Sequence, residues 1–161
     1  MSVSRPPGLV IALGLAALLL GLVPGWMPGA AGGGAVAGAC DVRISLVDFG
    51  RLDFEKGEDV TGELSVACDA PRAFAVTATR GLGDYDMRRM RSADGAELRY
   101  NLFVDPARRR VWGDGSGGTA RLVGQTDGRR PATFTIYGYV PGGQKVRRGS
   151  YSDSVTVALE R

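Results

Sequence analysis

The sequence of 161 residues contains no histidine and only two cysteines. Without histidine, the chain can form neither a Ser-His-Asp triad nor a Cys-His nucleophile pair. Two cysteines alone are also too few for a common structural zinc site. The 20 basic residues, mostly arginine, nearly balance the 17 acidic ones. These absences exclude the commonest hydrolase and zinc chemistries, and we predict no enzyme, no cofactor, and no catalytic or metal-binding residue.

The first 30 residues have the features of a secretory signal peptide. Arg5 gives a weakly positive start, and an uninterrupted apolar run extends from Leu9 to Val23. That run has about 15 residues, fewer than the roughly 20 of a membrane-spanning helix, so an uncleaved membrane anchor is the alternative. Small residues near Ala30 and at Ala35-Val36-Ala37 offer cleavage sites between positions 30 and 39. We predict a signal peptide over 1–30, a Gly/Ala-rich linker over 31–39 and an exported domain over 40–161.

The two cysteines, Cys40 and Cys68, both fall in the predicted exported domain. In an exported protein an even pair of cysteines indicates one disulfide. Cys40 keeps the alternation of Val42 and Ile44, and Cys68 keeps that of the strand that precedes it, so both sulfurs are expected to face the core. By loop-closure entropy, a Cys40–Cys68 bridge would stabilise the fold by roughly 3.5 kcal/mol.

Arginines gather in short clusters such as Arg108-Arg109-Arg110 and Arg129-Arg130. Clusters of this kind also occur in nucleic-acid-binding proteins. Here acidic residues are interspersed and the arginines stand beside turn residues. The pattern therefore favours a solvated surface, and we predict no nucleic-acid partner.

After the linker, apolar and polar residues alternate in a series of short segments. This period of two is typical of strands with one buried face. The expected strands are 42–46, 64–68, 74–78, 98–104, 120–122, 134–140 and 155–159, separated by glycine- and aspartate-containing turns. The arginine-rich stretch from Arg80 to the turn at Asp94-Gly95 is interpreted as a polar connection. Short strands at regular spacing, with no helical period, indicate an all-β sandwich.

Several residues could carry chemistry but have a simpler explanation. The pairs Asp84/Asp86 and Asp48/Asp53 have the residue types of a glycosidase dyad, yet they stand in turns. The glycine-rich stretch 113–118 carries no lysine and follows no βα pattern, which argues against a phosphate-binding loop. Trp112, Tyr137, Tyr139 and Tyr151 could stack on a sugar, although core packing is the simpler interpretation.

An ordered series of short motifs covers essentially all of 40–161. It consists of Cys40-x-Val42, Phe49-Gly50, Gly62 to Cys68, Arg89-Met90, Leu98-x-Tyr100-Asn101-Leu102 with Asp105, Val111-Trp112-Gly113-Asp114-Gly115, Tyr137-Gly138, Gln144-x-Val146 and Gly149-x-Tyr151-x-Asp153-x-Val155-x-Val157. No single motif is specific, but the ordered set resembles the spore coat protein U domain family, which includes subunits of archaic chaperone–usher pili. Two features depart from the family pattern. Tyr139 stands where members often have arginine, and the last residues are Leu159-Glu160-Arg161 where many members end on an aromatic residue.

The resemblance implies an immunoglobulin-like sandwich that lacks its last strand. A periplasmic chaperone would hold such a subunit by lending a strand, and an outer-membrane usher would then polymerise it with other pilin subunits at the cell surface. This is strand addition to an open sheet edge. On that basis the groove for the lent strand is expected to have Val155, Val157 and Leu159 on one rim and Val42, Ile44 and Leu46 on the other.

The sequence thus predicts an exported structural or adhesive pilus subunit that serves surface attachment and biofilm formation. A free-standing secreted β-sandwich that binds a carbohydrate or a surface is the alternative, and a small exported hydrolase is the third. An internal fibre subunit must also donate a strand, for which residues 31–39 offer one side chain larger than a methyl group, that of Val36. We therefore expect a place at the tip of a fibre or a capping role.

Overall fold

The computed structural model describes residues 10–12, 39–45 and 47–160. Most of the predicted signal peptide (1–30) and linker (31–39) lies outside the described residues, as does Leu46 of the predicted groove. Of these segments only Val10–Ala12 and Ala39 are described. The described part of the chain contains no helix, and hence none long and apolar enough to cross a membrane.

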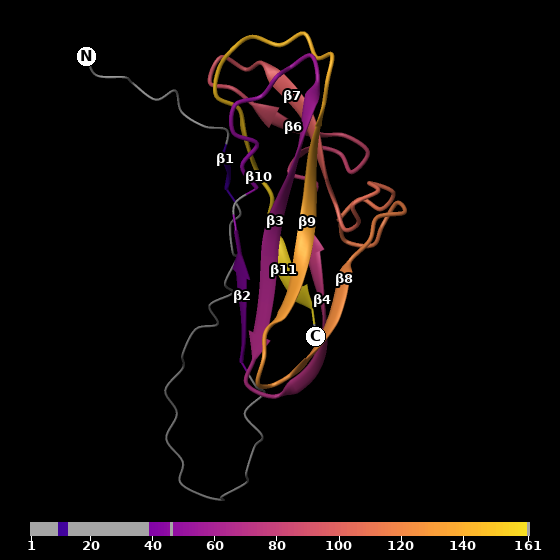
Figure 1. The fold of residues 1–161 in the computed structure, drawn as a ribbon. Helices are drawn as coiled ribbons and strands as arrows, with labels where there is room; N and C mark the ends of the chain where they lie inside the picture. The colour runs from indigo at the N-terminus through magenta and orange to yellow at the C-terminus, as the bar shows by residue number, and fades with distance from the viewer. Residues whose placement is uncertain (1–9, 13–38, 46, 161) are drawn as a thin grey trace, which may run out of the picture.

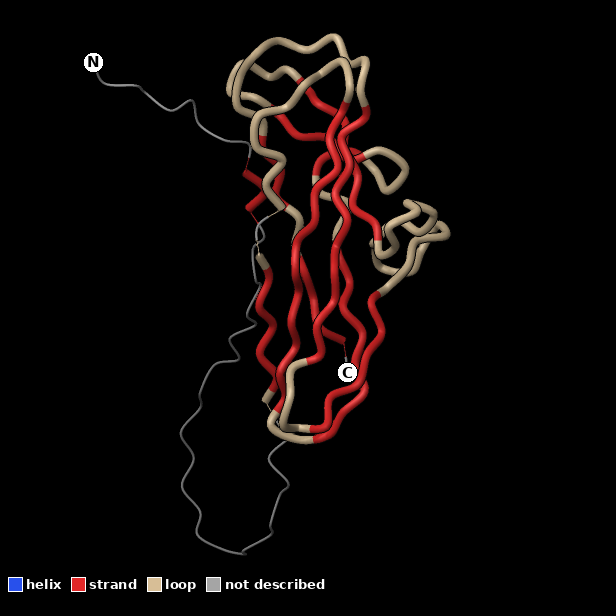
Figure 2. Tube along the Cα trace, viewed as in Figure 1, coloured by secondary structure: helices blue, strands red, loops and turns tan. Residues whose placement is uncertain are grey.

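The described residues form eleven strands (Figures 1 and 2). Their bounds are β1 Val10–Ala12, β2 Cys40–Ile44, β3 Gly57–Cys68, β4 Pro71–Ala78, β5 Leu82–Gly83, β6 Arg88–Arg91, β7 Glu97–Phe103, β8 Leu122–Asp127, β9 Ala132–Pro141, β10 Ser152–Ser154 and β11 Val157–Glu160. An eight-stranded sheet has the order β1-β10-β6-β7-β9-β3-β2, with β5 added beside β6. A three-stranded sheet has the order β11-β4-β8. The all-β fold class predicted from the sequence is confirmed.

Strands β3 and β9 are the two longest strands of the large sheet. They pair antiparallel from Gly57↔Pro141 to Val66↔Ala132. Along β3, Leu64, Val66 and Cys68 are buried while the residues between them are exposed or half-buried, as strand alternation requires. These side chains join one core shared by both sheets, in which Phe74 of β4 contacts Phe134 of β9 edge to face. Burial of this shared core stabilises the packing of the two sheets.

The predicted disulfide is present. Cys40 on β2 lies directly opposite Cys68 on β3, and the two sulfurs are bonded. Cys68 is buried and Cys40 is partly buried against the core, so both follow the inward phase that the alternation predicts. The bridge links β2, the first strand of the predicted domain, covalently to β3.

Several strand predictions need correction. The strand expected at 120–122 begins at Leu122 and continues to Asp127 as β8, and the strand expected at 64–68 begins earlier, at Gly57. The stretch interpreted as a polar connection contains β6, in which Arg88 and Met90 are buried. The predicted single strand 155–159 begins earlier, at Ser152, and is divided between the sheets: β10 pairs with β6, and β11 pairs with β4. The division occurs at Val155-Thr156, where Thr79 N donates to Thr156 O (2.9 Å) and Thr156 N donates to Thr79 Oγ1 (2.9 Å). We refer to residues 152–160 together as the C-terminal strand.

One side of the sandwich is bounded by two edge strands. Across the molecule the sheets run in the same order, β2-β3-β9 in one and β11-β4-β8 in the other (Figure 1). Strands β2 and β11 are therefore the edges on the same side, which we call the open side. No described strand pairs with the outer edge of β2 or of β11. The open side is where a further strand could join the fold.

Candidate functional site

The C-terminal strand carries most of the candidate site. From Tyr151 to Leu159 every second residue faces inward: Tyr151, Asp153, Val155 and Val157 are buried, and Leu159 is half-buried. The residues between them are exposed or half-buried. This alternation continues without interruption across the division between β10 and β11. One row of side chains therefore faces the core although its backbone pairs with two different sheets.

The outer edge of the C-terminal strand is only partly paired. At β10, residues Ser152–Ser154 pair in parallel with Val10–Ala12 of β1, which lies on the side opposite β6. Beyond Ser154, the outer edge has no strand partner among the described residues. An unpaired edge presents free backbone N–H and C=O groups to any extended segment that can align with it.

Strand β2 borders the same side from the other sheet. Val42 and Ile44 are half-buried and pack against the core, while Asp41 and Arg43 between them are exposed. The structure thus places Val42, Ile44 and the row from Val155 to Leu159 on the inward faces of the two strands that bound the open side. Their role as rims of a groove for a lent strand stays a prediction.

Asp153 is a buried carboxylate on the same strand, and sequence reasoning assigned it no role. Its side chain is 4% exposed. Oδ2 accepts a hydrogen bond from Tyr100 Oη (2.6 Å), and Oδ1 accepts from Leu82 N (3.0 Å) and Ser154 N (2.7 Å). Burial raises the pKa of Tyr100, and the hydrogen bond to Asp153 raises it further, so Tyr100 is the donor at neutral pH.

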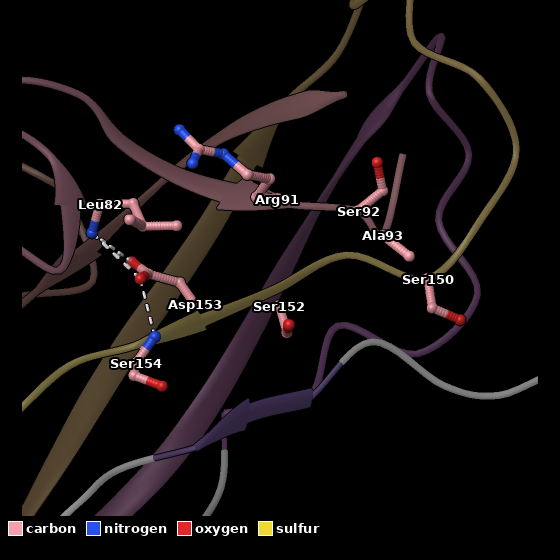
Figure 3. A pocket seen from close by; sticks show the side chains of 8 residues that line it. All are labelled: Leu82, Arg91, Ser92, Ala93, Ser150, Ser152, Asp153 and Ser154. Carbon is pink, nitrogen blue, oxygen red and sulfur yellow. Dashed lines mark hydrogen bonds between the residues drawn. The ribbon is translucent and has the colours of Figure 1, made fainter. Parts of the chain in front are cut away.

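A surface pocket lies beside Asp153 (Figure 3). Its volume is about 540 Å³, and serine side chains of β10 and of the β6–β7 turn line it together with Arg91 and Leu82. The Asp153 carboxylate closes one side of the pocket, where it bonds the main chain of Leu82 and Ser154. The pocket therefore borders the strand edge on which β1 pairs.

Next to this carboxylate the interior holds a positive charge. Arg88 is completely buried; its guanidinium donates to Asn101 Oδ1 (2.7 Å) and to the carbonyl oxygens of Thr79 (2.9 Å) and Trp112 (2.7 Å). Burial lowers the pKa of Arg88, and Tyr100, Tyr85 and the charge of Asp153 oppose that effect. A guanidinium remains protonated under such a shift because its ordinary pKa is so high. Arg88 and Asp153 thus give the core opposite charges near the C-terminal strand.

The carboxylate pairs considered for hydrolysis occupy turns. Asp48, Asp53 and Asp84 each accept a hydrogen bond from a main-chain N–H two or three residues ahead, at 2.8–3.0 Å. This is how aspartate stabilises a turn. Within the described part of the chain, no group of three or more His, Cys, Asp or Glu residues could hold a metal ion.

The aromatic residues considered for sugar stacking do not form one surface. Trp112 is fully buried and donates from Nε1 to Val76 O (3.2 Å), and Tyr151 is 1% exposed. Tyr137 and Tyr139 are half-buried, and Tyr139 is covered by the guanidinium of Arg108 at 3.9 Å from the ring centre. Two of the four rings are therefore structural parts of the core.

Comparison with known proteins agrees with this architecture. The family defined by the Spore Coat Protein U domain matches residues 33–158, which is most of the chain. The chain belongs to the spore coat protein U domain family. The resemblance stated from the sequence motifs is thereby confirmed.

One curated relative of this spore coat U domain protein and one solved structure extend the comparison. Protein U of Myxococcus xanthus is 32% identical over 143 residues, covering 77% of this chain and 78% of Protein U. Among solved structures, a chain of the CsuC–CsuE chaperone–tip adhesion subunit pre-assembly complex, from the archaic chaperone–usher Csu pili of Acinetobacter baumannii, aligns with a TM-score of 0.54 at 23% identity. That alignment covers 76% of the spore coat U domain protein and only 40% of the other chain. At this identity the likeness shows the fold.

Proposed function

We propose that this protein is an exported subunit of a chaperone–usher pilus and that it accepts a strand from its partners on the open side. The observation that carries the proposal is the C-terminal strand. Over residues 155–160 its outer edge has no partner among the described strands, and Val155, Val157 and Leu159 form its inward row. An extended segment with alternating apolar residues would satisfy both the free backbone groups and the apolar face.

The pairing of β1 supports the same mode of binding. Val10–Ala12 is an apolar segment far away in the sequence, and it aligns residue by residue with Ser152–Ser154. This pairing supports the proposal that the outer edge can accept an added apolar strand; β1 itself belongs to the predicted signal peptide, so its place would be free after export. During the proposed assembly of the pilus, a periplasmic chaperone supplies the added strand first, and a neighbouring pilin subunit replaces it at the usher.

Family membership and the shared fold support the biological setting of the proposal. The structure with this fold is a complex of a chaperone with a tip adhesion subunit. By analogy, we place the protein in the periplasm and then in a pilus at the cell surface, as a structural or adhesive subunit for attachment and biofilm formation. In this setting its functional parts are a strand edge and an apolar face, and catalysis has no part in it.

The decisive experiment tests whether the solubility of the protein depends on a strand donor. The full chain is expressed in the periplasm alone, with a pilus chaperone of its own organism, and with that chaperone after the apolar residues of its donor strand are changed to aspartate. Without a chaperone we expect the protein to be degraded or to aggregate. With the intact chaperone it should form a soluble one-to-one complex, and the altered chaperone should not restore its solubility. A soluble, stable monomer without any chaperone would overturn the proposal and would favour a free-standing secreted domain.

A further inference from the structure

The first part of the C-terminal strand, β10, has little backbone pairing with its own sheet. Strand β10 aligns with β6 through one residue pair, Ser152↔Arg91. Its other backbone neighbour is β1, on the outer edge. A strand held by so few backbone contacts is free to shift or peel away unless side chains fix it.

The Asp153 carboxylate supplies such a fixation. It accepts a hydrogen bond from Leu82 N on β5 (Figure 3) and another from Tyr100 Oη on β7, so it connects β10 to two strands that are not its ladder partners. A third bond, from Ser154 N, orients the carboxylate within β10 itself. Bonds from several donors to a charged acceptor are the strong class of protein hydrogen bond.

The position of Asp153 also sets the register of the strand. A slip of one residue would turn the side chain of Ser152 or Ser154 inward and bring the charge of Asp153 to the surface. It would also turn Val155, Val157 and Leu159 away from the core. The hydroxyl of Tyr100 on β7, which is fully buried, would then lose its acceptor, which is strongly unfavourable. Asp153 therefore selects the register in which the apolar row faces inward.

Gly81 keeps room for this arrangement. It has a positive φ of 61°, and a Cβ built there would overlap the Asp153 carboxylate. Only glycine both adopts this conformation without strain and leaves space for the carboxylate next to Leu82 N. A second position, on a different element, thus depends on the same contact.

We infer that Asp153 is the positioning residue of the strand-accepting edge: its bonds to Leu82 and Tyr100 hold the C-terminal strand in the register that an added strand requires. This inference rests on the proposed function. It assigns a positioning role to Asp153, which is distinct from the apolar residues that would contact the donor strand. Loss of the carboxylate would lower the population of the accepting conformation, and the apparent affinity for a donor would fall by the same factor.

The test uses a synthetic peptide of residues 9–16, with lysines added at its ends for solubility. The protein, purified from the periplasm after removal of the signal peptide, is refolded from urea with its disulfide intact, and soluble complex is measured across a peptide titration. We expect Asp153→Ala to raise the half-maximal peptide concentration about tenfold or more. Asp153→Asn keeps an oxygen for Leu82 N but loses the acceptor for Tyr100 Oη, so its half-maximal concentration should lie between those of the unmodified protein and Asp153→Ala. Ser152→Ala, on the exposed face of the same strand, is the matched control and should change nothing.

Pulse amide exchange during refolding provides a readout that does not depend on the peptide. Asp153→Ala and Gly81→Ala should both reduce protection at residues 152–160 while β7 and β9 keep theirs. An unchanged titration and unchanged protection, or an equal loss of protection over all three strands, would overturn the inference. If the unmodified protein responds neither to the peptide nor to a chaperone, the proposed function fails, and the exchange data still decide the role of Asp153.

Discussion

Arg88 shows how one residue can reverse the meaning of a local sequence pattern. It stands in the run Arg88-Arg89-Met90-Arg91, whose composition indicates a solvated connection. In the structure its side chain is buried together with Met90, and the two arginines between and after them are exposed. The guanidinium is tolerated there because three acceptors surround it. Its Nε is the one buried side-chain polar atom among the described residues without a partner.

Changes at Arg88 are expected to separate the contributions of charge and volume. Arg88→Ala leaves the oxygens of Asn101, Thr79 and Trp112 without their donor and opens a cavity, so we expect a loss of about 3–5 kcal/mol in the free energy of unfolding. Arg88→Met fills most of the volume and should lose clearly less. Urea unfolding, followed by the fluorescence of the buried Trp112, measures both. A loss under about 1 kcal/mol for Arg88→Ala would show that the acceptors find other donors.

At the scale of elements, the sequence predicts the strands whose large apolar residues alternate along the chain. Strands β2, β4, β7 and β9 lie close to their expected positions, and the expected disulfide joins β2 and β3. These segments follow the rule that one face is apolar. The family resemblance, which rests on sequence alone, also predicts that the C-terminal strand carries most of the site.

Two features of the site could not be read from that rule. Strand β6 presents a buried arginine, and β10 presents the buried Asp153, so both have polar residues at inward positions. Only the three-dimensional arrangement shows their partners, because Tyr100 and Leu82 are 53 and 71 residues away from Asp153 in sequence. The division of the C-terminal strand between sheets likewise depends on contacts with Thr79 that no local pattern encodes.

The inward face of β11 gives a direct test at this scale. Val157 is 4% exposed and lies opposite Ala78 of β4. Val157→Asp places a charge without a partner against the apolar core, at a cost of several kcal/mol. We expect loss of the complex with a chaperone and proteolysis of the subunit, measured as the yield of periplasmic complex.

Ala158→Asp is the matched control for this change. It introduces the same charge on the next residue, whose side chain is exposed on the other face of the strand. The complex should be recovered in nearly normal yield. Equal yields for Val157→Asp and Ala158→Asp would mean that the inward face of β11 is not required for acceptance of a strand.

At the scale of the whole molecule, the open side is the proposed acceptor of a strand, and an internal fibre subunit would also need a donor arm. To fill the open side of a neighbouring subunit, an arm needs on the order of 5–10 residues with bulky apolar side chains at alternate positions. Before Cys40, positions 32, 34, 36 and 38 share one phase, and only Val36 is bulky; the other three are glycine. Glycine buries little apolar area and loses more backbone entropy when ordered in a strand. We therefore expect the unmodified protein to accept a strand without donating one, as a tip or capping subunit would.

The prediction is tested by giving the arm the side chains that it lacks. The N-terminus of the exported protein is sequenced first, to establish which of residues 31–39 remain. Replacing Gly32, Gly34 and Gly38 with valine should then create a donor, so that the subunit released from its chaperone forms homopolymers that resist dissociation in gel electrophoresis. Valines at positions 33, 35 and 37 place the same three side chains in the opposite phase and should leave the protein unpolymerised. Homopolymers from the unmodified chain would end the assignment to a fibre tip, because its glycine-rich arm would then suffice as a donor.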